Sequence, residues 1–195
     1  MAAVGTVYER IDHEIREFVD EQHMFFVATA PREGGHVNLS PKGLDTLRIL
    51  DDLTVAYLDL TGSGAETAAH LRDDGRITLM FCAFSGRPRI VRLFGRGAVC
   101  ERGAADFDRL VAHFPVLPGI RSVITVDVDR VADSCGFAVP RYDYVGDRDV
   151  LPRQLARRTE AELAAYRDAT NATSIDGLPA FGRRADAGEA GSAGR

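Results

Sequence analysis

The stretch LDLTGSGAETAAHLRDDGRITLMF, residues 58–81, places a strand, a glycine-rich turn, a helix and another strand in close succession. The first strand is predicted over residues 54–60 and runs into the turn Gly-Ser-Gly at residues 62–64. A short helix is expected over residues 66–72. The nearly continuous apolar run at residues 77–84 is typical of a strand in the middle of a sheet. The order of elements leaves open whether the turn binds a ligand or only starts the helix.

The Gly-Ser-Gly turn supports two interpretations. Ser63 and Glu66 have the spacing of a capping box, in which Ser63 caps the helix and the Glu66 side chain reaches back. A helix N-terminus after glycines also presents free N–H groups to a phosphate, although the Glu66 carboxylate would repel one. The nucleotide motifs GxGxxG and GxxxxGK[ST] are both incomplete, and Thr67 stands where the third glycine of the first motif belongs. Neither nucleotide motif therefore explains this turn.

Regular patterns outside this stretch predict further strands and helices. Strands are expected over residues 24–30, 36–40, 89–101 and 122–131, and helices over residues 8–22, 104–113 and 151–168. The fold class is mainly β, because six strands joined by hairpins or short helices favour an antiparallel, nearly closed barrel with peripheral helices. Consecutive strands argue against a parallel doubly wound sheet, which requires strand–helix alternation. Gly95 and Gly97 are expected at a bulge or bend.

The composition is that of a soluble protein with one core. With 195 residues, 45% of them hydrophobic and 27% charged, the chain is long enough for one domain, which we place at residues 1–181. Residues 182–195 are rich in Gly, Ala and charge and are expected to be a disordered tail. The net charge of −5 disfavours a nucleic-acid partner, and no apolar run reaches the length of a membrane span. Since no secretory pattern is present, we expect a cytoplasmic protein.

No cluster of residues indicates acid–base, nucleophilic or metal chemistry. The three cysteines and five histidines are scattered, so neither a disulfide framework nor a metal site is predicted. No Ser-His-Asp order or pair of carboxylates stands out either. This pattern suits a protein whose chemistry is carried by an organic cofactor.

The order of motifs along the chain resembles that of a known family. The strand MFFVATA is followed by HVNLSPKG on a returning strand, then by the stretch at residues 58–81, and then by PRIVRLFGRGAV. This order is similar to that of the pyridoxamine 5′-phosphate oxidase-like family, the FMN-binding split barrels. The resemblance covers residues 8–131 as a domain pattern. Residues 133–181 are similar to a bacterial subgroup whose substrates are generally unassigned.

The resemblance implies a six-stranded split barrel that forms a homodimer, with FMN bound at the interface between the subunits. In this family the flavin ring lies against strands that match residues 36–40 and 57–61, and hydroxyl and basic groups near the turn hold the phosphate. The cofactor-binding residues implied in this way are Asn38, Leu39, Ser40, Lys42, Leu60, Thr61, Ser63, Gly64, Thr67 and Arg89.

The turn departs from the family pattern in its charge. Many members carry basic residues in the helix after the turn, where this chain has Glu66 and Thr67. The phosphate charge would then be met by Lys42, Arg89, Arg92 or an arginine of the partner subunit. For the segment at residues 171–181, two alternatives stay open: it folds over its own barrel, or it latches onto the neighbouring subunit near the flavin.

The function implied by the resemblance is that of an FMN-dependent oxidoreductase acting on a small organic substrate. Its substrate and catalytic residues are not assigned by the sequence. Two alternatives stay open. One is a non-catalytic protein of the same fold that binds or sequesters a flavin, a deazaflavin or haem, and the other is a structural dimer with an empty cleft.

Overall fold

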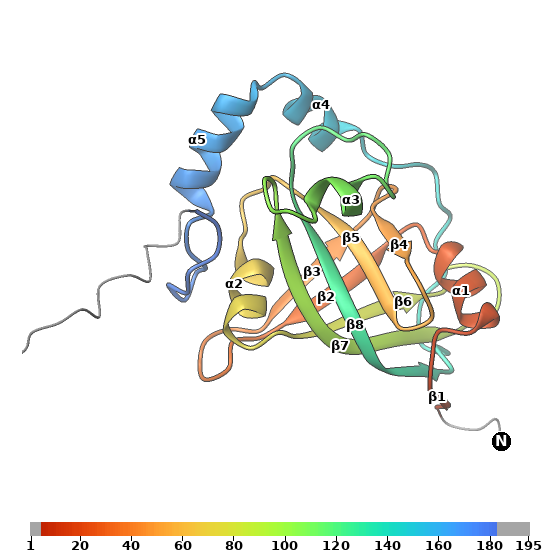
Figure 1. The fold of residues 1–195 in the computed structure, drawn as a ribbon. Helices are drawn as coiled ribbons and strands as arrows, with labels where there is room; N and C mark the ends of the chain where they lie inside the picture. The colour runs from red at the N-terminus through yellow and green to blue at the C-terminus, as the bar shows by residue number, and fades with distance from the viewer. Residues whose placement is uncertain (1–4, 183–195) are drawn as a thin grey trace, which may run out of the picture.

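The computed structural model describes residues 5–182, which form one curled sheet with helices around it (Figure 1). The sheet has eight strands in the order β3-β2-β6-β7-β8-β5-β4, with β1 paired to β8. The strands are β1 (Val7–Tyr8), β2 (Phe25–Thr29), β3 (Asn38–Lys42), β4 (Leu47–Ile49), β5 (Thr54–Leu60), β6 (Arg76–Cys82), β7 (Ile90–Glu101) and β8 (Ile120–Ser134). Every pairing between these strands is antiparallel, which confirms the predicted class and excludes the doubly wound sheet.

The barrel is split between its two edge strands. Among the described residues, β3 pairs only with β2 and β4 pairs only with β5, so the curled sheet does not close between β3 and β4. The helix α2 (Glu66–Asp73) packs against β2, β6 and β7. The strand–turn–helix–strand order expected at residues 58–81 is therefore confirmed. The chain passes from β5 through the turn and α2 to β6, in the other half of the sheet.

Four further helices surround the barrel. They are α1 (His13–Asp20), α3 (Phe107–Val111), α4 (Val150–Ala156) and α5 (Glu160–Thr170). The helix α1 begins at Asp12, whose side chain accepts a hydrogen bond from the backbone N–H of Ile15. Its apolar side chains Ile15, Phe18 and Val19 are buried in the barrel core, so the amphipathic pattern is confirmed over a shorter helix than expected.

The core lies inside the curl of the sheet and follows from alternation along the strands. In β8 the side chains of Ile124, Val126 and Val128 share one face of the strand and are all buried. Asp127 and Asp129, which alternate with them, are exposed. Burial of one such Val or Ile side chain contributes roughly 1.5–3 kcal/mol, so this inner face supplies much of the stability of the barrel.

Two strands and one break between helices were not predicted. β1 and β4, with two and three residues, are too short to show a period of alternation, so the expected count of six strands was too low. The helix expected over residues 151–168 is two helices, because Thr159 and Glu162 form a capping box that starts α5 anew. The tail expected at residues 182–195 lies outside the described residues apart from Gly182.

A long segment without secondary structure links β8 to α4. Residues 141–149 of this segment are all exposed. Two of its tyrosines anchor it: the backbone N–H of Tyr142 donates to the carbonyl oxygen of Phe84 at 2.9 Å, and the Tyr144 ring stacks on His23 with 3.6 Å between ring centroids. The segment at residues 141–149 is therefore held against the barrel by few contacts.

The bend of β7 is set by Gly95. The register between β7 and β8 shifts between Phe94 and Gly95, which confirms the expected bulge. A Cβ at Gly95 would lie 2.1 Å from the backbone carbonyl oxygen of Asp127. A Cβ at Gly97 would meet the Leu71 side chain at 2.8 Å, because α2 packs closely on β7 there. Both glycines therefore permit close approach, one to a strand and the other to a helix.

The substitution Gly95→Ala is expected to lower the free energy of unfolding by about 3 kcal/mol, since the clashing atom is backbone and cannot rotate away. Urea denaturation followed by circular dichroism measures the loss. Gly43→Ala is the matched control, because its Cβ would lie 3.6 Å from the nearest atom, the carbonyl oxygen of His23. An unchanged midpoint for Gly95→Ala would show that the bulge tolerates a side chain.

Candidate functional site

The split of the barrel has a polar inner side, formed by one row of β3. Side chains alternate along a strand, so Asn38, Ser40 and Lys42 face the barrel interior and Leu39 faces outward. Their partners on β2 are its inward-facing, buried residues. Lys42 is the only lysine in the chain. This row of amide, hydroxyl and ammonium groups is half-buried, and it lies where β3 approaches the end of β5 and the start of α2.

Asn38 is the centre of a hydrogen-bonded network that joins β2, β3 and α2. Its amide nitrogen donates to Thr29 Oγ1 at 3.2 Å and to Thr67 Oγ1 at 3.1 Å. Its carbonyl oxygen accepts from Ser40 Oγ at 2.9 Å. Thr29 Oγ1 also lies 3.0 Å from Nδ1 of the buried His70. Two predicted site residues, Asn38 and Thr67, are therefore in direct contact, although they are far apart in sequence.

Two buried polar atoms beside this network have no partner among the described residues. Thr29 Oγ1 accepts from Asn38, so its own proton points to His70 Nδ1, which leaves His70 Nε2 protonated and unpaired. The hydroxyl of Tyr57 is also unpaired, and burial raises the pKa of Tyr57 well above its ordinary value. Because buried polar groups are normally hydrogen-bonded, the interior next to β3 is polar without being fully satisfied.

A buried ion pair lies at the end of β5. Arg121, on β8, donates from Nε to Asp59 Oδ2 at 2.6 Å and from Nη2 to Oδ1 at 3.3 Å. Ser122 Oγ donates to the same carboxylate at 3.2 Å. Both charged side chains are almost fully buried, with 7% of Arg121 and 4% of Asp59 exposed. Only hydrogen-bonded partners of opposite charge make such burial tolerable.

Lys42 adds a second positive charge beside this ion pair. Burial alone would raise the pKa of Asp59, but the charges of Arg121 and Lys42 hold it below its usual value. The Lys42 ammonium lies 3.5 Å from Asp59 Oδ1, a longer contact than that of Arg121. It also lies 5.9 Å from the centroid of the Tyr57 ring. Since Arg121 already neutralises Asp59, the positive charge of Lys42 is available to an anionic ligand.

Arg121 and Asn171 hold the Gly-Ser-Gly turn in place by hydrogen bonds to its backbone. Arg121 Nη2 donates to the carbonyl oxygen of Gly64, and its Nη1 donates to Asn171 Oδ1, both at 2.8 Å. The Asn171 amide in turn donates to the carbonyl oxygen of Gly62 at 3.0 Å. The Phe181 ring covers the guanidinium of Arg121, with 4.6 Å to the ring centroid. The conformation of the turn thus depends on residues from β8 and from the end of the described chain.

The segment Asn171–Phe181 forms a small hairpin, here called the C-terminal hairpin. The backbone N–H of Phe181 donates to the carbonyl oxygen of Asn171, and Thr173 bridges to Pro179. At its tip, Asp176 accepts from the ring Nδ1 of His36 at 2.7 Å. Of the two alternatives that the sequence left open, the structure shows the first, since this segment folds over its own barrel.

The predicted capping box at the start of α2 is wrong. The helix begins at Glu66 with Ala65 in the capping position, and no side chain accepts a hydrogen bond there. Ser63 lies too early in the turn to cap the helix and is exposed. Glu66 Oε1 instead accepts from the backbone N–H of Ile175 at 3.3 Å. The Glu66 carboxylate was expected to help cap α2, but it accepts a hydrogen bond from the C-terminal hairpin instead.

Three of the predicted site residues lie apart from this cluster. The Leu39 side chain is on the outer face of β3 and is 62% exposed. Leu60 packs against an apolar cluster on the other side of the sheet. Arg89 lies beside α1, where it binds Asp133 at 2.9 Å and Glu14 at 2.8 Å. Arg89 is therefore not in contact with the turn residues of its own protomer, and its position near a flavin bound between subunits stays a prediction.

Thr61, Ser63 and Gly64 do lie at the turn, as expected. The hydroxyl of Thr61 is buried and donates to the carbonyl oxygen of Gly119 at 2.9 Å. It also accepts from Arg167 Nη1 at 3.2 Å. Thr61 is thus a structural link between the turn, β8 and α5, and Ser63 presents the exposed hydroxyl of the turn.

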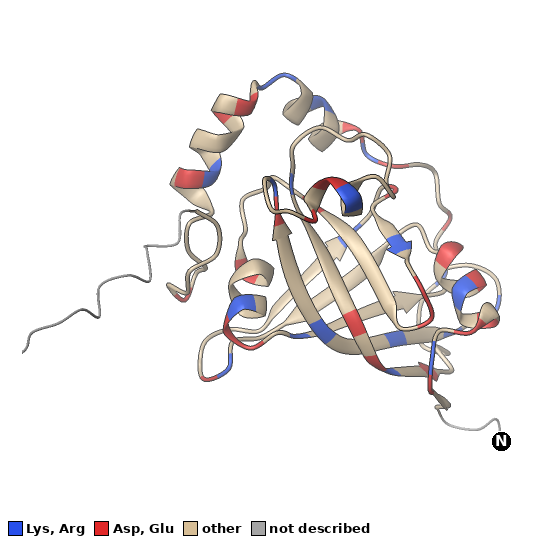
Figure 2. Cartoon of the chain, in the orientation of Figure 1, with Lys and Arg blue, Asp and Glu red and all other residues tan. Residues whose placement is uncertain are grey.

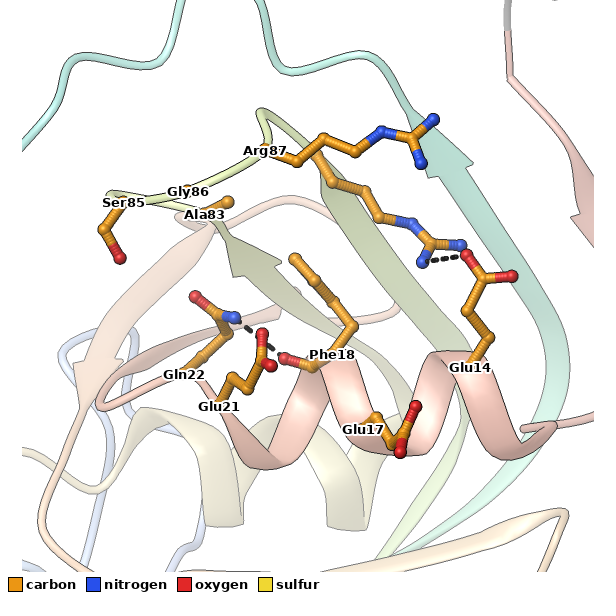
Figure 3. Close-up of a pocket in the computed structure, with 10 residues that line it drawn as sticks. Glu14, Glu17, Phe18, Glu21, Gln22, Ala83, Ser85, Gly86 and Arg87 are labelled. Atoms are coloured by element: carbon orange, nitrogen blue, oxygen red, sulfur yellow. Dashed lines mark hydrogen bonds and ion pairs between the residues drawn. The ribbon is translucent and has the colours of Figure 1, made fainter.

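A groove of about 290 Å³ lies between α1 and the loop that joins β6 to β7 (Figure 3). Glu14, Glu17 and Glu21 line its α1 side, and Arg87 lies on the opposite side. Arg89 also lines the groove. The mixture of acidic and basic residues is not particular to this groove. Figure 2 shows that charged residues of both signs are spread over the helices and loops of the described chain. The groove does not include the polar row of β3.

Three residues that organise the site were not predicted. Asp59 lies in the strand predicted at residues 54–60, Arg121 comes just before the strand predicted at residues 122–131, and Asn171 follows a helix. The one signal in the sequence was Asp59, the single charged residue of the strand at residues 54–60. Because an unpaired buried charge is unfavourable, a charged residue in such a strand indicates a buried partner of opposite charge.

The geometry defines a split-barrel protein, with an antiparallel barrel open between two edge strands and a polar row facing the split. A family model described as pyridoxamine 5′-phosphate oxidase matches residues 11–135. A pyridoxamine 5′-phosphate oxidase family protein, ustO of Aspergillus flavus, is 41% identical over 189 residues, covering 88% of this chain and 76% of that protein. The chain therefore belongs to the pyridoxamine 5′-phosphate oxidase family.

Two solved structures align with this fold at a TM-score of 0.50. A single-residue variant of HupZ from Group A Streptococcus is 25% identical and aligns with a TM-score of 0.50 over 63% of this chain and 98% of that chain. A Lactobacillus delbrueckii protein named for pyridoxamine 5′-phosphate oxidase is 17% identical, with a TM-score of 0.50 over 66% and 98% of the two chains. More distant structures include a FAD-binding protein of Mesorhizobium loti and the haem storage protein HutZ of Vibrio cholerae, with TM-scores of 0.48 and 0.42.

Within residues 5–182, none of the helices has the length and apolar character needed to cross a membrane.

The substitution Arg121→Met is expected to destabilise the fold by about 3–5 kcal/mol, because it leaves the Asp59 carboxylate buried and unpaired. Arg109→Met is the control, since Arg109 and Asp106 form an exposed pair on α3 whose loss costs less than about 1 kcal/mol. Urea denaturation at neutral pH measures both. Equal stability of the two variants would show that the buried pair does not hold the site together.

Proposed function

We propose that the split of the barrel binds FMN and that the protein is an FMN-dependent oxidoreductase acting on a small organic substrate. The observation that carries this proposal is the inward row of Asn38, Ser40 and Lys42 on an edge strand, next to the end of β5 and the start of α2. Membership of the pyridoxamine 5′-phosphate oxidase family supports the same ligand.

The chemistry of this row fits most parts of a flavin. Both N–H groups of Asn38 and the hydroxyl proton of Ser40 are already donated within the network, so the Asn38 carbonyl oxygen and the Ser40 hydroxyl oxygen can accept from an N–H of the ring or from the ribityl hydroxyls. Lys42 can pair with a phosphate, because Asp59 is already neutralised by Arg121. The turn fits a phosphate less well, since the Glu66 carboxylate lies in the first turn of α2.

A bound flavin supplies hydride transfer, which explains why a redox protein needs no acid–base pair of its own. The residues of the chain bind and orient the ring and keep its phosphate end near positive charge. Asn38 is well suited to orientation, because three hydrogen bonds to Thr29, Ser40 and Thr67 fix its amide.

The alternative of a protein that only stores or sequesters a flavin, a deazaflavin or haem is an outcome of the same experiments. The purified protein is titrated with FMN, and the loaded protein is then mixed with a reduced nicotinamide nucleotide under anaerobic conditions. Bleaching of the flavin absorption supports catalysis. Binding without reduction by any nicotinamide nucleotide favours storage.

A homodimer belongs to this proposal, with the FMN site at the interface between the subunits and the outer face of β3 as part of that interface. Leu39 and Val37 are exposed on β3 and the loop before it. A recess of about 370 Å³ lies beside them, lined by residues of β2, β6 and β7 that include Ala28 and Phe94. Exposed apolar side chains on an edge strand are typical of a surface that another chain covers.

The substitution Lys42→Ala is expected to weaken FMN binding by about tenfold, because it removes one charge-assisted contact to the phosphate. The quenching of flavin fluorescence measures the affinity. Lys42→Arg should retain much of the affinity, and Arg109→Ala should not change it. Since Lys42 is the only lysine, FMN should also protect the wild-type side chain from amine-specific reagents. Equal affinity of Lys42→Ala and wild type would remove Lys42 from the site.

The substitution Leu39→Asp is expected to convert the dimer to a monomer, because it places a charge in an apolar interface. Sedimentation velocity measures the change. Val116→Asp is the control, since Val116 is fully exposed in the loop between α3 and β8. A wild-type protein that sediments as a monomer would refute the proposed assembly.

A further inference from the structure

We propose that Glu66 sets the ligand preference of this chain by occupying the phosphate-binding end of α2, so that a flavin without phosphate binds about as well as FMN. This inference rests on the proposed flavin site. Riboflavin and FMN differ only in the phosphate group, so a comparison of the two ligands isolates the effect of Glu66 on phosphate binding.

The Glu66 carboxylate lies over the turn itself. Its Oε1 accepts from the backbone N–H of Ile175, and its Oε2 would be 2.6 Å from a Cβ built on Gly64. Glu66 is the first residue of α2, where free backbone N–H groups attract negative charge. Because the capping residue Ala65 offers no polar side chain at this helix end, the anionic group that lies there is the carboxylate of the chain itself.

The C-terminal hairpin keeps this carboxylate in place. The tip of the hairpin is fixed by Asp176, which accepts from both the backbone N–H and the ring of His36. Its base is fixed by Asn171, which binds the buried Arg121. The N–H of Ile175 therefore has a fixed position between two anchors. Moving Glu66 away would leave that N–H without its partner.

The cations near the turn are already committed. Arg121 is paired with Asp59, and Arg167 is paired with Glu160 at 2.5 Å. A phosphate dianion at the turn would meet the Glu66 charge without a free guanidinium to offset it. Lys42 remains, and its attraction for the phosphate is offset by the repulsion from Glu66. The phosphate of FMN therefore adds little to the affinity of the ring and ribityl chain.

The test compares two ligands on wild type and on Glu66→Gln, which keeps the length of the side chain and an oxygen that can accept from Ile175. Fluorescence titration with riboflavin and with FMN gives four dissociation constants. Wild type is expected to bind the two ligands within about threefold of each other, and Glu66→Gln to strengthen FMN binding by about tenfold. Riboflavin affinity should stay the same in both proteins.

Asp168→Asn is the matched control, because it removes one negative charge from an exposed position on α5. It should leave both affinities unchanged. Glu66→Lys should favour FMN more strongly than Glu66→Gln, and added salt should reduce the gain.

The outcomes separate this inference from the proposed function. If wild type binds neither ligand, the flavin site itself is refuted and this inference with it. If wild type binds FMN far more tightly than riboflavin and Glu66→Gln changes neither affinity, the flavin site stands and the role of Glu66 is refuted. An equal gain in Asp168→Asn would refute that role as well, since net charge alone would then explain the effect.

Discussion

The ion pair between Arg121 and Asp59 is the constraint on which the rest of the site depends. A guanidinium and a carboxylate without water are stable only when each satisfies the other, so their strands must keep a fixed position. Arg121 also binds a carbonyl oxygen of the turn and the amide of Asn171. One side chain thus connects the end of β5, the start of β8, the glycine turn and the C-terminal hairpin.

This arrangement is the reason that the edge strand β3 suits the proposed binding site. The barrel stops at β3, and the inward side chains of that strand face a neighbourhood whose charges are largely balanced. Since the carboxylate of Asp59 is held ionised by its partners, the Lys42 ammonium is left with a weak contact of 3.5 Å. A balanced interior with one spare cation is suited to an anion or to a ring with polar edges. The Glu66 carboxylate beside the turn disfavours a phosphate dianion there.

The sequence revealed elements with strong periodicity and missed those set by distant contacts. The strand at Thr54–Leu60 was predicted with its observed bounds, because seven residues in a row are suited to a buried strand. The three residues of β4 gave no such pattern. The capping box failed because Glu66 binds Ile175, 109 positions later in the chain, and local spacing cannot show such a contact. The resemblance implied Asn38 and Thr67 as parts of one site, and the two side chains are in contact, whereas Arg89 contacts Asp133 and Glu14 instead.

The exposed segment at residues 141–149 has a consequence for the integrity of the molecule. Protease access is greatest where backbone is exposed and few contacts hold it, and this stretch meets both conditions. A single cut there would give two polypeptides, of which the smaller carries α4, α5 and the C-terminal hairpin. The smaller fragment would remain attached, because Asn171 is completely buried against the guanidinium that the larger fragment provides. The nicked protein would therefore run as one species in solution and as two bands after denaturation.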